Sequence, residues 1–178
     1  MDLSNLRELA CKNFYKDITD NLIAKIMQPS LEKIYFEVNS KHVYFNLLYY
    51  AFETLQNASH LEITSNDISS DSALSSIKFN ALLSTKRKTK FKGCKIGCLN
   101  LDIEINGILK FCETFMEIHG TLTLLFCSSR DNPDFITNFR NSKKLWEEEK
   151  NIPICCIICK FMDQDPHLSF ETHHYEII

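Results

Sequence analysis

The chain contains few of the residues that interrupt regular structure. Its 178 residues include only four glycines and four prolines, which argues against a repeat array and against a loop-dominated scaffold. No apolar stretch approaches the roughly 20 residues that span a bilayer, and residues 1–10 lack the basic and apolar regions of a signal peptide. We therefore expect a protein that is neither secreted nor membrane-spanning, whose eight cysteines are reduced.

The sequence also lacks the motifs of the common enzyme classes. It contains no G-x-S-x-G, no P-loop, no G-x-G-x-x-G and no H-E-x-x-H. Asp102 and Glu104 lie two residues apart but alternate with apolar residues, which is typical of the solvated side of a strand rather than of a catalytic pair. We therefore expect no enzymatic activity, no catalytic residue and no cofactor.

The composition is that of a folded protein of mixed charge. Apolar residues make up 44% of the chain and include thirteen phenylalanines, which is enough to fill a core and excludes global disorder. The formal net charge of −3 and the isoelectric point of about 6.1 exclude a generic polycation. Any surface for an anionic partner must therefore be local.

Hydrophobic periodicity predicts an α+β fold in which helices pack on an antiparallel sheet. Apolar residues recur at helical spacing in three segments, at 3–28, 45–57 and 133–149. Short alternating or β-branched segments predict strands near 32–39 and 152–161. We expect three parts in the chain: an N-terminal helical segment (1–30), a globular α+β domain (31–162) and a C-terminal tail (163–178).

The centre of the predicted sheet is an antiparallel meander at about residues 98–127. Apolar and polar residues alternate strictly from Leu99 to Ile105, and the Asn106-Gly107 dipeptide that follows is a strong hairpin signal. His119-Gly120 predicts a second turn before a third strand. A β-branched residue at position 107 is expected to disrupt such a hairpin.

A basic run directly precedes this segment and is the main candidate binding site. Six cations fall within ten residues: Lys86, Arg87, Lys88, Lys90, Lys92 and Lys95. Such a cluster can bind phosphate-rich partners by counterion release, and Phe91 can add a stacking or membrane contact. The same residues also fit a nuclear import signal or a solvated loop, so three interpretations stay open.

Cysteines near the C-terminus suggest zinc, but packing explains them better. Cys156 and Cys159 have two-residue spacing, Cys155 precedes them, and His167, His173 and His174 follow. However, these cysteines lie in an apolar strand, whose alternation directs Cys155 and Cys159 to one face and Cys156 to the other. Free cysteines are commonly buried. We interpret them, together with Cys94 and Cys98, as packing residues and predict no metal site.

The order of these segments resembles the globular domain of rhabdovirus matrix proteins. The resemblance spans about residues 32–161 and rests on a strand at Lys33–Val38, a helix around Phe45–Leu55, a strand at Gly120–Phe126 and a helix before Ile154–Cys159. The Pro-Pro-x-Tyr budding signal and the basic N-terminal tail of animal-virus members are absent, so a plant-infecting relative fits better.

The resemblance implies a viral structural protein that associates with itself and connects the nucleocapsid or RNA to an anionic membrane surface. The basic run would be the electrostatic contact, and the expected location is the virion and the host cytoplasm. Three other functions stay open: a plant-virus movement protein of the 30-kilodalton superfamily, similar at Gly120–Asp131, a host-directed module that binds RNA or protein, and a small zinc enzyme.

Overall fold

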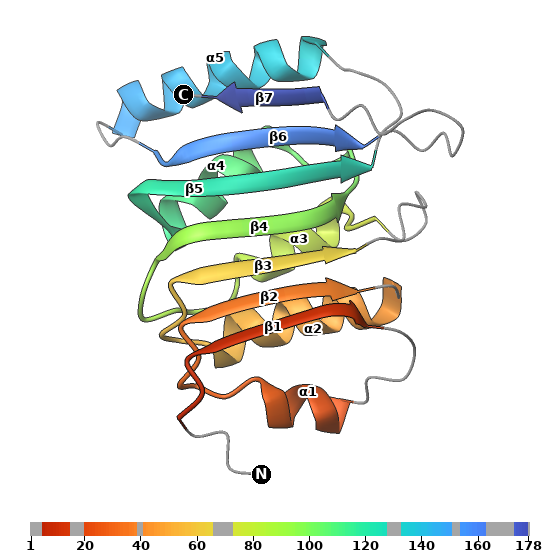
Figure 1. Cartoon of the computed structure of the whole chain (residues 1–178). Coiled ribbons are helices and arrows are strands. Elements are labelled where there is room, and N and C mark those ends of the chain that lie inside the picture. The colour runs from red at the N-terminus through yellow and green to blue at the C-terminus, as the bar shows by residue number, and fades with distance from the viewer. Residues whose placement is uncertain are drawn as a thin grey trace.

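The computed structural model describes residues 5–14, 20–38, 41–65, 73–127, 133–150, 154–162 and 173–177. They form one seven-stranded sheet whose first six strands are connected along the chain by helices (Figure 1). The strands are β1 (Glu8–Phe14), β2 (Lys33–Val38), β3 (His60–Ser65), β4 (Phe91–Leu99), β5 (Met116–Cys127), β6 (Cys156–Met162) and β7 (His173–Ile177). The helices are α1 (Asp20–Ile26), α2 (Lys41–Thr54), α3 (Ser76–Leu82), α4 (Ile105–Phe115) and α5 (Pro133–Lys150).

The sheet is almost entirely parallel, so the predicted antiparallel fold class is wrong. The strands follow one another in chain order from β1 to β7. Each pair from β1·β2 to β5·β6 is parallel, and only β7 runs antiparallel to its neighbour β6. A helix connects each parallel pair, as parallel strands require a long crossover. Consecutive strand order with strand–helix units is also the arrangement of solenoid proteins.

The predicted meander around 98–127 is likewise wrong. Strand β4 ends at Leu99, and the Asn106-Gly107 dipeptide lies in the first turn of helix α4 instead of a hairpin. The residues that follow repeat at helical spacing on one buried side, namely Ile108, Leu109, Phe111, Cys112 and Phe115. Burial of this stripe overrides the local turn signal, since tertiary packing provides most of the stability of a helix.

The two ends of the chain also join the sheet. The predicted helix at 3–28 is wrong over Glu8–Phe14, which is strand β1, whereas α1 covers Asp20–Ile26. Leu9 and Cys11 of β1 pair with Ile34 and Phe36 of β2. The apolar side chains of this segment therefore recur at every second residue, as in a strand, and not at helical spacing. Residues 173–177, within the expected tail, form β7. The sheet therefore spans all three expected parts of the chain.

The helices cover one face of the sheet. Helices α2, α3 and α4 lie behind the strands in Figure 1. One buried cluster joins side chains from all five helices to the strands, with Ile23, Leu48, Phe79, Phe111 and Phe139 as helical members. The expected strand near 32–39 and the expected helices at 45–57 and 133–149 are present as β2, α2 and α5. Side chains of β2, α2 and α5 all belong to this main buried cluster.

Candidate binding surface

The face of the sheet opposite the helices carries a layer of half-exposed polar residues. In β2 and β3, buried and half-buried positions alternate along the strand. Because paired residues of neighbouring strands share a face, the half-buried positions line up in rows across the sheet. The central row contains Ala10, Tyr35, Glu62, Lys95, Thr123, Ile158 and Glu176. This mostly polar surface, the open face, has no helix over it among the described residues.

A hollow lies in the middle of the open face. It has a volume of about 190 Å³ and forms above Gly93, between the side chains of Tyr35, His60, Glu62, Lys95, Thr121 and Thr123. A Cβ atom at position 93 would lie 2.9 Å from Cδ2 of His60. The missing side chain of Gly93 therefore gives the hollow its depth, and its rim presents hydroxyl, imidazole, ammonium and carboxylate groups.

Ion pairs order the charges on this face. The ammonium group of Lys95 donates to Oε1 of Glu62 at 2.5 Å, and Lys33 lies 3.7 Å from Oε2 of Glu8. Nδ1 of His60 lies 2.9 Å from Oγ of Ser59. Two lysines of the open face are therefore each paired with a glutamate of the neighbouring strand.

The lysines of the predicted basic run lie at two different places in the structure. Lys86, Lys88, Lys90 and Lys92 are exposed on the segment that enters β4 and at its first residues. Nζ of Lys90 donates to the carbonyl of Glu113 at 2.7 Å, whereas Lys95 belongs to the open face. The four exposed lysines lie within seven residues, and they are the part of the run that can meet an anionic partner.

Arg87 is an internal part of the fold rather than a free cation. Its guanidinium carbon lies 3.7 Å from the centroid of the Phe91 ring, which is a close cation–π contact. Nη2 donates to the carbonyl of Ala58 at 2.8 Å, and Nε donates to that of Thr89 at 3.3 Å. Burial lowers the pKa of Arg87 to about 10. Arg87 thus joins the α2–β3 connection to the start of β4.

Among the described residues, the candidate zinc ligands do not come together in one site. Cys155 and Cys159 are buried, and Cys156 is half-buried on the other side of β6, as strand alternation predicted. Within the described part of the chain, no three His, Cys, Asp or Glu side chains are placed to hold a metal ion. His173 and His174 lie on β7, and His167 is outside the described residues. Hydrogen bonding with the Cys112 side chain lowers the pKa of Cys155.

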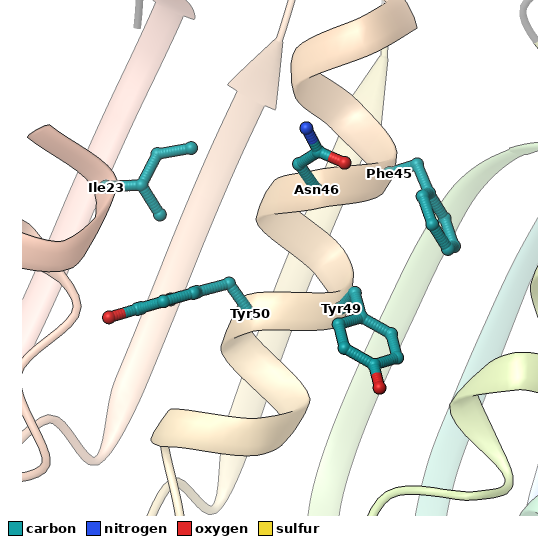
Figure 2. Close-up of a pocket in the computed structure, with 5 residues that line it drawn as sticks. All are labelled: Ile23, Phe45, Asn46, Tyr49 and Tyr50. Carbon is teal, nitrogen blue, oxygen red and sulfur yellow. The ribbon is translucent and has the colours of Figure 1, made fainter. Parts of the chain in front are cut away.

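A second hollow, of about 290 Å³, lies on the helical side (Figure 2). Ile23 of α1 and four residues of α2 line it: Phe45, Asn46, Tyr49 and Tyr50. The ring of Tyr50 extends toward α1, whereas Phe45 and Tyr49 extend to the opposite side of α2 (Figure 2). The aromatic rings therefore do not converge on one point, and the arrangement is not a cage for a cationic ligand.

The polar pair Asp102 and Glu104 lies before helix α4 rather than on a strand. Oδ1 of Asp102 accepts a hydrogen bond from the backbone N–H of Ser76 at 3.2 Å, at the start of α3. Glu104 precedes the first residue of α4 and is exposed. The local position of these carboxylates at helix starts suits the helix dipole.

Sequence reasoning identified only Lys95 among the residues that surround the hollow of the open face. Tyr35, His60, Glu62, Thr121 and Thr123 were not predicted, although each occupies a polar position in an alternating strand segment. The alternation of apolar and polar residues was the sequence signal from which these positions could have been predicted. Comparison with protein-family models, curated proteins and solved structures finds no match for this chain. None of the helices described here has the length and apolar character to cross a membrane.

Proposed function

We propose that this chain is a non-catalytic interaction protein that binds another polypeptide through the open face of its sheet. The observation that carries the proposal is the absence of a covering layer on this face of a parallel sheet, among the described residues. Parallel sheets are almost always covered on both faces. In solenoid proteins built from strand–helix repeats, which share the consecutive strand order, the extended surface lined by the strands is where partners bind.

The topology favours surface binding over a small-molecule cleft. In doubly wound α/β proteins, the ligand crevice forms where the strand order reverses. The described strands of this chain keep one consecutive order, so their sheet contains no such reversal. The hollow above Gly93 is instead a depression in a broad surface, suited to a side chain of a partner.

The charges of the open face favour a protein partner over a nucleic acid. Its described strand residues include four lysines and four glutamates: Lys12, Lys33, Lys95, Lys160, Glu8, Glu37, Glu62 and Glu176. Neutralising phosphates requires an excess of cations, which this set lacks. Tyr35 and Ile158 add an aromatic and an aliphatic contact near the centre, as in protein interfaces.

A second copy of the chain is the first partner to test, because a face with equal numbers of both charges has no net charge with which to repel a second copy of itself. Strands spaced about 4.8 Å apart, each with about six residues of about 3.3 Å, give a face of roughly 600 Å². That area is at the lower end of what each partner buries in a specific interface. Self-association is also what the resemblance to matrix proteins implies, and a viral matrix role stays a prediction.

We expect Thr123→Arg to abolish self-association. Thr123 is half-buried in the central row beside Lys95, and an arginine there would project from the face and unbalance its charges. Sedimentation velocity over a concentration series at low and high salt would measure the effect. The wild type should form larger species at high concentration, more so at low salt, and Thr123→Arg should remain monomeric.

The matched control is Leu145→Arg, the same new side chain on α5, where Leu145 is 65% exposed. This variant should associate as the wild type does. A wild type that stays monomeric at every concentration would exclude a second copy as the partner. Equal association of both variants would exclude the open face as the surface.

The four exposed lysines support a second candidate function, binding to an anionic partner. We expect combined replacement of Lys86, Lys88, Lys90 and Lys92 by glutamine to weaken binding to single-stranded RNA or to phosphatidylserine vesicles at least tenfold. Vesicle co-sedimentation and RNA titration at two salt concentrations would measure this. Arg87 is left intact because its replacement would disturb the fold. Unchanged affinity with an intact fold would exclude these lysines from such a contact.

A further inference from the structure

We propose that Cys98 and Cys127 form a thiol pair that hydrogen peroxide converts reversibly to a disulfide. The Sγ atoms of the two residues lie 3.1 Å apart, at the C-terminal ends of the neighbouring strands β4 and β5. A disulfide bond is about 2.05 Å long, so the two sulfur atoms need to approach each other by only about 1 Å to join.

The backbone of Cys98 has an unusual conformation at this point. Among the described residues, Cys98 is the only non-glycine residue with a positive φ, at 52°. The strand pairing explains the position: between Ile96 and Leu99, β4 advances three residues while β5 advances two, from Leu124 to Phe126. The register shifts here as it does at a β-bulge, where glycine commonly occupies a position with positive φ. A strained residue at a specific place is a reason to look for a function.

Neighbouring backbone groups hold Cys98 in this conformation. The N–H of Leu74 donates to the carbonyl of Cys98 at 2.7 Å, and the N–H of Asn100 donates to the carbonyl of Leu74 at 3.1 Å. Ala73 packs with both cysteines in a small cluster separate from the main core. The thiol of Cys98 is thereby fixed toward Cys127, which lowers the entropy lost when the two sulfurs join.

The two residues differ in access, and this suggests the order of the chemical steps. Cys127 is 8% exposed and Cys98 is fully buried, so the sulfur of Cys127 attacks one oxygen of hydrogen peroxide. The O–O bond breaks, Cys127 becomes a sulfenic acid, and water leaves. The sulfur of Cys98 then attacks the Cys127 sulfur and expels a second water. Two thiols lose two electrons in total, and one peroxide is reduced to two waters.

The disulfide would connect β4 to β5 and enclose helix α4 in a covalent loop between residues 98 and 127. Such a loop restricts the unfolded chain. We expect the melting temperature of the oxidised protein to exceed that of the reduced protein by roughly 5–10 °C. Dithiothreitol should return it to the reduced value.

Peptide mapping of the full-length wild type tests the link without any substitution. The protein is treated with hydrogen peroxide, unreacted thiols are blocked, and the chain is digested without reductant. We expect a peptide pair joined through Cys98 and Cys127, lighter by two hydrogens than the separate peptides. A different link, such as Cys112 to Cys155, or no link at all, would overturn the proposal.

Cys98→Gly is the most informative variant. Glycine suits the positive φ, which offsets part of the packing lost with the buried thiol, so this variant should still fold while losing both the linked peptide and the rise in melting temperature. Cys156→Ser is the control, since Cys156 is half-buried on β6 outside the pair, and it should keep both responses. A Cys98→Gly protein that is still stabilised by peroxide would contradict the assignment.

Discussion

Replacing Arg87 by alanine is expected to lower the free energy of unfolding by roughly 3 kcal/mol, although Arg87 belongs to a run of surface cations. The guanidinium group covers the ring of Phe91 and donates to the carbonyl groups of Ala58 and Thr89. The substitution removes a partly buried cation–π contact and leaves carbonyl oxygens without these donors. Thermal and urea unfolding, followed by circular dichroism, would measure the change.

Two further variants separate structure from charge. Lys88→Ala removes an exposed cation one residue away and should change the unfolding free energy by less than about 0.5 kcal/mol. Arg87→Lys keeps the charge but not the planar fork, so it should recover little of the lost stability. If Arg87→Lys were as stable as the wild type, charge alone would account for the role of this residue.

The main error in predicting the fold was to interpret the alternation of apolar and polar residues as a sign of antiparallel strands. Strands of a parallel sheet covered on both faces read as continuous apolar runs, whereas alternation is typical of antiparallel sheets with one wet face. Here the segments Lys33–Val38 and His60–Ser65 alternate although their strands are parallel. The cause is the one-sided helix layer, and a single strand carries no information about the direction of its neighbour.

Local signals misled in two other places for a similar reason. Asn106-Gly107 favours a hairpin in isolation, but five apolar residues at helical spacing follow it and are buried in α4. In residues 3–28, a helical pattern and a strand pattern both fit Leu9 and its neighbours. Pairing with β2, whose residues lie 24 or 25 positions further along the chain, decides for the strand, and such long-range pairing is not visible in a local window.

The candidate binding surface was even less accessible to sequence reasoning. The basic run was evident from the sequence as a cluster of charges. Four of its lysines are exposed, as is expected for a cluster of cations close together in the chain. The hollow above Gly93, however, combines Tyr35 of β2, His60 of β3 and Thr121 of β5. These residues lie tens of positions apart, and only the register of parallel strands brings them together. Each polar strand position could be predicted, but not its neighbours.

Gly120→Ala is expected to lower the free energy of unfolding by roughly 2 kcal/mol. A Cβ atom at this position would lie 3.0 Å from three backbone oxygens, those of Phe91, Lys92 and Glu117. Backbone atoms of a sheet cannot move aside as a flexible side chain can, so the strands β4 and β5 would have to separate locally. Overpacking of this kind costs about 1–3 kcal/mol, and a loss of about 2 kcal/mol lowers the melting temperature by roughly 4–8 °C in a chain of this size.

Gly107→Ala is the matched control, because it adds the same methyl group at the other glycine of a predicted turn. Its Cβ would lie 2.9 Å from Oδ1 of Asn80, the end of an exposed side chain that can rotate away. Alanine is favoured over glycine in helices by up to about 1 kcal/mol, so this variant should be as stable as the wild type or more stable. A large loss from Gly107→Ala would restore the hairpin interpretation, and a neutral Gly120→Ala would mean that the strands tolerate a wider separation there.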